Sequence, residues 1–278
     1  MPLDLKNSGN VPAHLPGRRF DHLFFSAMIV LMLGTVLLGF AHSYYLAGTL
    51  HAPLPARVLH VHAVVFTAWM LLLLTQTLLA SFHGIRIHRQ LGMAGIILAI
   101  LVGVLGVLAA ANSLARHAAG QDSALVPLTD LLIFIVLTGC AFHARSQPAA
   151  HKRLILIGSA GLLTPAIFRW PFPAFHHNFN LAVYTADVFV AMLVLYDLWS
   201  MRKVHRTTLL AGAFMILVQQ LRLPIGDTAA WHAVDLWIRS QASCLSGSST
   251  NSKSGNRSGT GPKGPSIRSQ GGTAEAVP

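Results

Sequence analysis

Polar side chains recur at a fixed spacing through the second long apolar stretch of the sequence. His62, Trp69, Gln76 and His83 follow one another at intervals of seven residues. Each step of seven turns an α-helix by only about 20°, so the four side chains form one stripe. Polar groups at membrane depth are costly in lipid and are expected to face a bundle interior. The stripe predicts such an interior, although each residue alone also fits a structural or interfacial role.

A second polar stripe is predicted in the sixth apolar stretch. His176, Asn180, Tyr184 and Asp187 share one helical face. An ionised carboxylate near the middle of a membrane costs about 2.5–3.5 kcal/mol, so Asp187 is expected to be paired, protonated or functional. Its candidate partners are Tyr184, Arg169 and a histidine of the second stretch. We expect the two stripes to line one shared interior.

Histidines near both ends of the apolar stretches suggest a redox cofactor. Haem b is held by two axial imidazoles on facing helices. The candidate ligands are His62 and His176 in an outer layer and His88, His151 and His205 in an inner layer. Two such layers suit electron transfer across a membrane, although these positions are shallow for a buried haem. A haem b redox protein with a redox partner is the first functional hypothesis.

Two other classes of function stay open, beside a purely structural role. Asp187 and Gln76 would serve a proton-coupled transporter of a small solute, and Gln219 and Arg222 would extend its polar region outward. Histidines with Asp187 around zinc would serve an intramembrane hydrolase. The hydrolase ranks last because no apolar stretch contains His-x-x-x-His or His-Glu-x-x-His. The sequence assigns no catalytic residue and no metal site.

Seven apolar stretches, most of them long enough to cross a bilayer, must position these residues. They span residues 20–42, 58–81, 90–112, 125–144, 152–170, 179–200 and 206–224. About 20 apolar residues at 1.5 Å each match a hydrocarbon core of about 30 Å. Only 10% of residues are charged, against about a quarter in soluble domains. The sequence predicts an all-α, polytopic membrane bundle of seven transmembrane helices, one helix followed by three hairpins.

Basic residues are unevenly distributed between the loops, which sets the predicted orientation. Eleven of them lie before the first stretch or after the second, fourth and sixth stretches, whereas the opposite loops carry Arg57, Arg116 and Arg169. The positive-inside rule places the N-terminus in the cytoplasm and the C-terminus outside, in a bacterial inner membrane. The net charge of +11 therefore reflects topology, and we expect the lipid bilayer, not nucleic acid, as partner.

A short pattern recurs at the start of the third, fifth and seventh stretches. His-(Arg/Lys)-x5-Gly is found at 88–95, 151–158 and 205–212. Seven residues are nearly two helical turns, so each glycine lies on the face of its histidine and would let a neighbouring helix approach closely. The pattern predicts three repeated hairpins. The alternative is chance recurrence of basic corners.

The two ends of the chain differ from the bundle. Residues 1–19 are polar and are predicted to be a cytoplasmic segment. Residues 225–239 place Trp231 and Ile238 on one helical face, which predicts a short interfacial amphipathic helix on the outer surface. Residues 240–278 are rich in Ser and Gly and are predicted to be disordered.

Several motifs together resemble a group of uncharacterised bacterial multipass membrane proteins. These motifs are the spacing His62–Trp69–Gln76, His88-Arg89-x-Leu-Gly, His151-Lys152-Arg153-Leu154 and Pro165-Ala166-Ile167-x-Arg169-Trp170. The likeness covers about residues 55–238. It implies a multipass topology and no particular activity. A weaker likeness to bis-histidine b-type cytochromes rests on the histidines.

Overall fold

The computed structural model describes residues 17–46, 57–82, 84–116, 125–175 and 178–247, which are helical with no β-strand among them. The helices are α1 (Gly17–Phe40), α2 (Arg57–Ser81), α3 (Ile85–Arg116), α4 (Leu125–His143), α5 (Pro148–Ala160), α6 (Thr164–Ile167), α7 (Phe179–Met201), α8 (Arg206–Gly226) and α9 (Ala229–Gly247). A π-helical turn, Ala41–Tyr45, extends α1. Short 3-10 turns occupy Ala144–Ser146 and Pro173–Phe175.

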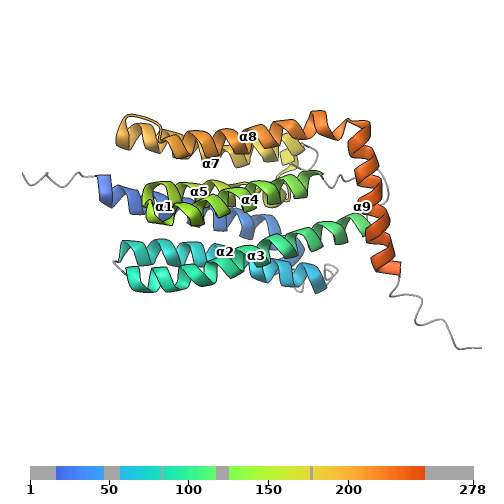
Figure 1. Cartoon of the computed structure of the whole chain (residues 1–278), viewed down its shortest axis with the longest axis horizontal. Helices are drawn as coiled ribbons and strands as arrows, with labels where there is room; N and C mark the ends of the chain where they lie inside the picture. Colours follow the sequence, from blue (N-terminus) through green and yellow to red (C-terminus); the bar gives the residue numbers. More distant parts are fainter. Residues whose placement is uncertain (1–16, 47–56, 83, 117–124, 176–177, 248–278) are drawn as a thin grey trace, which may run out of the picture.

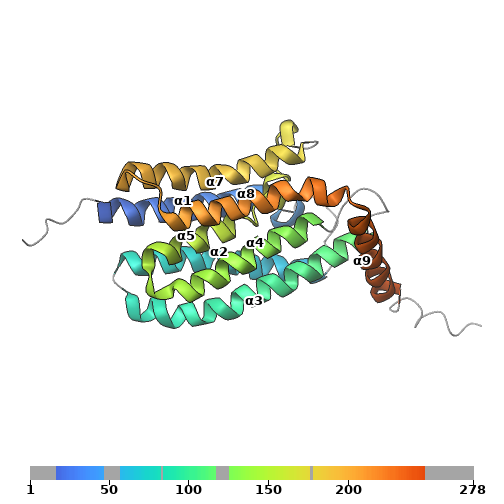
Figure 2. The ribbon, with the colours of Figure 1, turned by 45° about the horizontal axis from the view of Figure 1, so that its top comes forward.

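The long helices run side by side and form a layered bundle (Figure 1). The α2–α3 hairpin packs on α1 and α4, and the α7–α8 hairpin packs on α4 and α5. The helices α1, α4 and α5 therefore lie between these two hairpins, as the turned view also shows (Figure 2). The α2–α3, α4–α5 and α7–α8 turns all lie at the end of the bundle where α1 begins, which we call the corner end. The helix α9 lies across the opposite end.

Among the described residues, six helices are long and apolar enough to cross a membrane. They are Phe20–Phe40, Arg57–Ser81, Ile85–Asn112, Leu125–Ser146, Phe179–Met201 and Arg206–Gly226. The remaining predicted span, 152–170, is not one helix but α5, of 13 residues, followed by α6, of 4 residues. Thirteen residues reach only about 20 Å, short of the hydrocarbon core of about 30 Å. The predicted count of seven continuous spans is not confirmed.

Pro165 explains the break between α5 and α6. Proline has no N–H, so it cannot bond to the carbonyl of Gly161 as a continuing helix requires. The preceding turn tightens instead, with the N–H of Leu162 bonded to the Ser159 carbonyl at 3.2 Å and that of Leu163 to the Ala160 carbonyl at 3.0 Å. Leu163 is fully buried. The interruption thus lies inside the bundle, where protein surrounds it.

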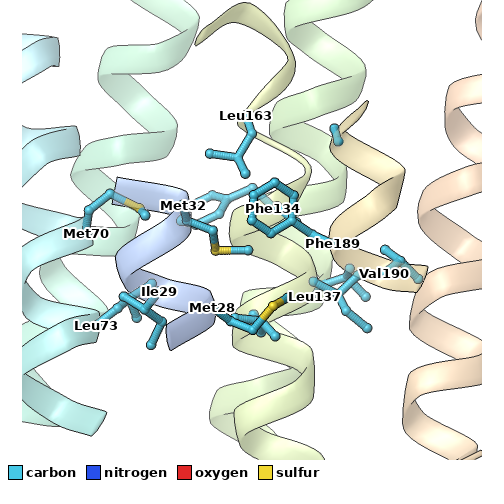
Figure 3. Packing of buried hydrophobic residues seen from close by; sticks show 14 of the residues in the cluster. Met28, Ile29, Met32, Met70, Leu73, Phe134, Leu137, Leu163, Phe189 and Val190 are labelled. Atoms are coloured by element: carbon cyan, nitrogen blue, oxygen red, sulfur yellow. The ribbon is translucent and has the colours of Figure 1, made fainter. Parts of the chain in front are cut away.

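Apolar side chains from the packed helices fill the core. Figure 3 shows this packing, with Met28, Ile29 and Met32 of α1, Met70 and Leu73 of α2, Phe134 and Leu137 of α4, Leu163, and Phe189 and Val190 of α7. Large apolar side chains also cover the outside of the bundle, as at Leu23 and Leu210, which are 67% and 71% exposed. Such an outer surface suits contact with lipid.

The glycines of the repeated pattern pack against the other helix of their own hairpins. An added Cβ would lie 3.3 Å from Leu72 at Gly95, 3.2 Å from Leu137 at Gly158 and 2.7 Å from Val190 at Gly212. Each neighbour belongs to the preceding helix of the same hairpin. A side chain of the neighbouring helix therefore lies beside each of the three glycines, whereas the close approach of backbones that the pattern predicts stays a prediction.

The helix α9 differs in extent from the predicted interfacial helix. It begins at Ala229 and continues to Gly247, so the predicted boundaries, 225 and 239, are wrong. Thr228 precedes it, and its hydroxyl accepts a hydrogen bond from the N–H of Trp231 at 3.1 Å. Residues 240–247 are helical although we predict disorder from 240, because Gln241, Ala242 and Leu245 favour helix. Residues 1–16 and 248–278 lie outside the described residues.

Candidate functional site

A cluster of polar side chains lies between α4, α7 and α8. Arg222 of α8 donates from Nη2 to Oδ1 of Asp130 on α4, and the two side chains are only 5% and 3% exposed. Gln219 is buried one turn before Arg222, on the same face of α8. Asp187 of α7 lies within electrostatic range of the Arg222 guanidinium, whose ion pair is with Asp130. We call these four residues the polar centre.

Most polar atoms of the polar centre make no hydrogen bond with any residue that the structure describes. They are Oδ2 of Asp130, Oδ1 of Asp187, both amide atoms of Gln219, and Nε and Nη1 of Arg222. Buried polar groups are normally hydrogen-bonded, because desolvation without a partner costs about 1–3 kcal/mol. The polar centre therefore offers buried donors and acceptors that suit water, protons or a small polar solute.

A second buried ion pair lies at the corner end. Arg153 of α5 donates from Nε to Oδ1 of Asp197 at 3.2 Å, and the side chains are 3% and 0% exposed. Oδ2 of Asp197 accepts from the hydroxyl of Thr208 at 2.5 Å and from the N–H of His205 at 3.1 Å. Nη1 of Arg153 donates to the carbonyl of Ala149 at 2.8 Å. The polar atoms of this pair are thus all satisfied.

A neighbouring ion pair ties α1 to the same end of the bundle. Lys152 donates from Nζ to Oδ2 of Asp21, and the hydroxyl of Tyr196 donates to Oδ1 at 3.1 Å. The Lys152 ammonium also lies 4.4 Å from the centre of the Phe25 ring, over its face. Together with Arg153, Asp197, His205 and Thr208, these residues connect α1, α5, α7 and α8. We call Asp21, Lys152, Arg153, Tyr196, Asp197, His205 and Thr208 the corner cluster.

Two residues of the polar stripe of α2 donate hydrogen bonds to other helices. Trp69 is buried, and its Nε1 donates to the hydroxyl of Ser159 on α5 at 3.1 Å. Gln76 donates from Nε2 to the carbonyl of His88, at the start of α3, at 3.1 Å. His62 is half-buried, and its Nδ1 makes no hydrogen bond within the described part of the chain. Sequence reasoning identified the stripe but not these partners.

The predicted shared interior of the second and sixth spans is wrong. Gln76 lies about 28 Å along α2 and Asp187 about 12 Å along α7, at 1.5 Å per residue, and both helices run toward the corner end. The helices α1, α4 and α5 also separate α2 from α7 (Figure 2). Tyr184 is 57% exposed, and Arg169 donates to the carbonyl of Pro165 at 2.7 Å. The positive charge within range of Asp187 is that of Arg222, which is not among the predicted partners.

The repeated histidines bond to the main chain near the turns of their hairpins. Nδ1 of His88 lies 3.1 Å from the carbonyl of Gln76, and Nδ1 of His151 lies 2.7 Å from that of Ala141. Nδ1 of His205 instead accepts from the N–H of Thr207 at 3.1 Å, which caps α8. His83 and His176 lie outside the described residues. Among the residues described, no group of three or more His, Cys, Asp or Glu side chains is placed to hold a metal ion.

Comparisons of the chain with protein-family models, with curated proteins and with solved structures found no match. The functional evidence therefore comes from the molecule itself. Sequence reasoning identified Asp187 but not its relation to Arg222, nor the pairing of Arg222 with Asp130. The available signal was a set of acids and arginines within apolar stretches, because charges buried in a membrane protein usually pair with one another.

Proposed function

We propose that the chain is a multipass protein of a bacterial cytoplasmic membrane, with its N-terminus in the cytoplasm, that moves protons through the polar centre, alone or together with a small polar solute. The single observation behind this proposal is that the polar centre contains buried polar atoms without a hydrogen-bond partner among the described residues. Asp130 is paired with Arg222, Asp187 lies within range of the same positive charge, and buried donors and acceptors remain without partners among the described residues. Intramembrane ionisable groups of this kind commonly mark ion or proton pathways.

The charge of the polar centre favours a proton as its ligand. Asp130, Asp187 and Arg222 together carry a formal charge of −1 when both carboxylates are ionised. An unbalanced charge is costly in a low-dielectric interior, so binding of one proton stabilises the centre. Arg222 pairs with Asp130, and its charge also acts on Asp187. Protonation of one carboxylate therefore favours pairing of Arg222 with the other, which gives the centre two arrangements.

The broken segment between α5 and α6 supports a transport role. Discontinuous helices in the middle of a bundle frequently form the binding sites of transporters. Thr164 begins α6 and is fully buried, and its hydroxyl has no hydrogen bond within the described ranges. The carbonyl of Gly161 cannot accept a hydrogen bond from Pro165, because proline has no N–H. These groups add polar character to the central layer, next to α7 and α8.

Apolar residues separate the polar centre from the corner cluster. Along the buried face of α8, Ala211 and Met215 lie between Thr208 and Gln219, and Met215 is fully buried. The helix rises about 21 Å from Thr208 to Arg222. A proton at the polar centre would therefore need a change in packing, or water entry, to pass toward the corner end. We propose this layer as the barrier of the pathway.

Proton uptake into liposomes tests the proposal. Purified protein reconstituted with an internal pH-sensitive dye should admit protons under an imposed membrane potential. Asp187→Asn should reduce the uptake at least tenfold, because it removes a carboxylate that can bind a proton. Asp235→Asn makes the same chemical change on α9, outside the bundle, and should leave uptake unchanged. Equal uptake by the wild type and Asp187→Asn, or none by the wild type with any solute tested, would contradict the proposal.

A second candidate function is favoured by the geometry of His88 and His151. Both lie at the corner end, at the beginnings of α3 and α5, and each places Nδ1 against a main-chain carbonyl. Imidazoles that bind metals commonly donate their other ring N–H in this way, which leaves Nε2 as the ligand atom. We propose haem b as the group that they would hold. Protein purified from haem-supplied cells should then show a Soret band that His151→Ala removes, whereas colourless protein would refute this candidate.

A further inference from the structure

A shallow apolar groove lies between α1 and α7 at the corner end. The residues that shape it are Phe20, Phe24 and Ala27 of α1 and Leu195, Tyr196 and Trp199 of α7. Both helices are among the six that are long and apolar enough to cross a membrane, and they run side by side (Figure 2). The groove is open toward the outside of the bundle, where Leu195 is 64% exposed. Its walls would therefore meet lipid.

Aromatic rings bridge the groove near its corner end. Phe20 and Trp199 meet edge to face with ring centres 5.5 Å apart, and Phe24 stacks on Tyr196 at 3.9 Å. Trp199 is 66% exposed. Tryptophan and tyrosine favour the level of lipid headgroups, where an apolar ring and a polar edge are both satisfied. The groove thus runs from apolar membrane depth to a headgroup level.

Two exposed basic residues come directly after α7, the helix that forms one wall of the groove. Arg202 and Lys203 come immediately after α7 and are both exposed. Arg202 ends α7 in the left-handed region, with φ 56°, and its N–H bonds to the carbonyl of Leu198 at 2.9 Å. A residue with a side chain pays about 1–2 kcal/mol in this conformation, so glycine is usual there. Arg202 therefore takes a backbone conformation that is more usual for glycine.

We propose that this groove binds an anionic phospholipid. One acyl chain would lie along Ala27 and Leu195, and the phosphate would meet Arg202 and Lys203. The nearby carboxylate of Asp21 does not oppose this charge, because Lys152 pairs with it. Clusters of lysine and arginine beside a membrane helix attract anionic lipids. The site is separate from the polar centre and does not depend on the proposed transport.

Lipid retention measured by native mass spectrometry tests this site. The full chain, purified in detergent and incubated with equal amounts of phosphatidylglycerol and phosphatidylcholine, should retain phosphatidylglycerol preferentially. The double variant Arg202→Gln/Lys203→Gln should lower that preference about tenfold, as expected for the loss of attractive charges near a membrane surface. The double variant Arg89→Gln/Arg145→Gln removes the same charge from other exposed positions at the corner end and should leave the preference unchanged.

A second pair of variants separates the groove from general attraction to charge. Ala27→Phe places a ring in the groove from an exposed position, and Ala213→Phe adds the same ring to an exposed face of α8. The first should reduce phosphatidylglycerol retention about tenfold, and the second should not. Equal retention of both lipids by the wild type, or equal losses in each variant and its control, would overturn the proposal. A mass of two chains without lipid would instead show that a second copy covers the groove.

Discussion

Two buried aspartate–arginine pairs in the described part of the chain lie toward opposite ends of the bundle and differ in how completely they are hydrogen-bonded. Asp197 accepts from Arg153, Thr208 and the main chain of His205, and Arg153 donates from each of its guanidinium nitrogens. Asp130 accepts only through Oδ1, and Arg222 keeps Nε and Nη1 without a partner in the described part of the molecule. The same two residue types thus form one closed network and one open network.

This difference indicates different roles for the two pairs. A buried ion pair whose lone pairs and protons are all satisfied holds its helices in one arrangement, because any movement exposes an uncompensated charge. A pair with unsatisfied atoms already lacks part of that stabilisation, and a ligand can supply the missing hydrogen bonds. We therefore expect the corner cluster to determine stability and the polar centre to determine activity.

The largest expected effect is on stability, from the loss of Arg153. The change Arg153→Met leaves Asp197 buried without its counter-charge, and removing one partner of a buried pair typically costs about 3–5 kcal/mol. Arg222→Met should cost clearly less, because Asp130 can bind a proton and the polar centre is incompletely bonded already. The free energy of unfolding, measured for each variant by denaturant titration in mixed micelles, distinguishes the two pairs.

The outcome of this pair of variants also bears on activity. Arg222→Met should abolish proton uptake while the protein stays folded. If Arg222→Met lowers the free energy of unfolding by as much as Arg153→Met or more, the open network contributes as much to stability as the closed one. The comparison between the two ends of the bundle would then fail.

A smaller effect is expected where α1 crosses α6. A Cβ at Gly39 would lie 2.1 Å from the carbonyl oxygen of Ala166, a main-chain atom that cannot move cheaply, whereas a Cβ at Gly34 would meet nothing within 4 Å. Gly39→Ala should therefore destabilise the protein by about 1–3 kcal/mol. Gly34→Ala should be neutral or slightly stabilising, because alanine favours helix more than glycine does. Unfolding titrations of both variants would show whether α6 is held against α1.

The membrane helices were predictable from the sequence, whereas the break at α5 and α6 was not. Hydropathy depends only on how many residues are apolar. Apolar residues lie on both sides of the break, at Leu154–Ile157 and Ala166–Phe168, so hydropathy alone predicts one continuous span. The consequence of Pro165 depends on whether neighbouring helices can surround a tightened turn. Here Gly161 fits against Ile133 of α4, where an added Cβ would lie 2.7 Å from the isoleucine side chain. That contact joins residues far apart in the sequence.

The candidate site was predictable only in part, for a related reason. Helical spacing gives the face on which Asp187 or Gln76 lies, but not which helix packs on that face. Gln76 finds the carbonyl of His88 across the turn of its own hairpin, so its amide needs no partner from a distant helix. Asp130 and Arg222 lie 92 residues apart. Their pairing follows from the packing of α8 on α4, which no local pattern encodes.

An effect of about 1–3 kcal/mol is expected at the contact between α2 and α5. Ser159→Ala removes the acceptor of Trp69 Nε1 and leaves a buried N–H without its partner, which typically costs about 1–3 kcal/mol. Ser81→Ala serves as the control, because the Ser81 hydroxyl bonds only within α2, to the carbonyl of Thr77, and should cost less than about 0.5 kcal/mol. Similar unfolding free energies for the two variants would show that the Trp69 hydrogen bond does not help to join these helices.

The smallest expected effect is a pH dependence at the corner end. Burial, followed by the nearby charge of Arg153, lowers the pKa of His205 from its ordinary value of 6.5; Lys152 and Lys203 act in the same direction and Asp197 opposes them. The unfolded chain therefore binds a proton more readily than the folded chain. The free energy of unfolding should fall as the pH drops below about 6.5, and the fall should stop below the folded pKa.

The size and the cause of this dependence can both be checked with one variant. The slope for one proton is at most about 1.4 kcal/mol per pH unit, and solvent near His205 should keep it well below that limit. A proton on Nδ1 also removes the acceptor of the Thr207 N–H and so uncaps α8. His205→Asn keeps a capping acceptor without a titrating ring, so its unfolding free energy should vary less with pH than that of the wild type between pH 5 and about 7. An unchanged pH dependence in this variant would show that another group causes the titration. Proton uptake through the polar centre should respond to Asp187→Asn and not to His205→Asn.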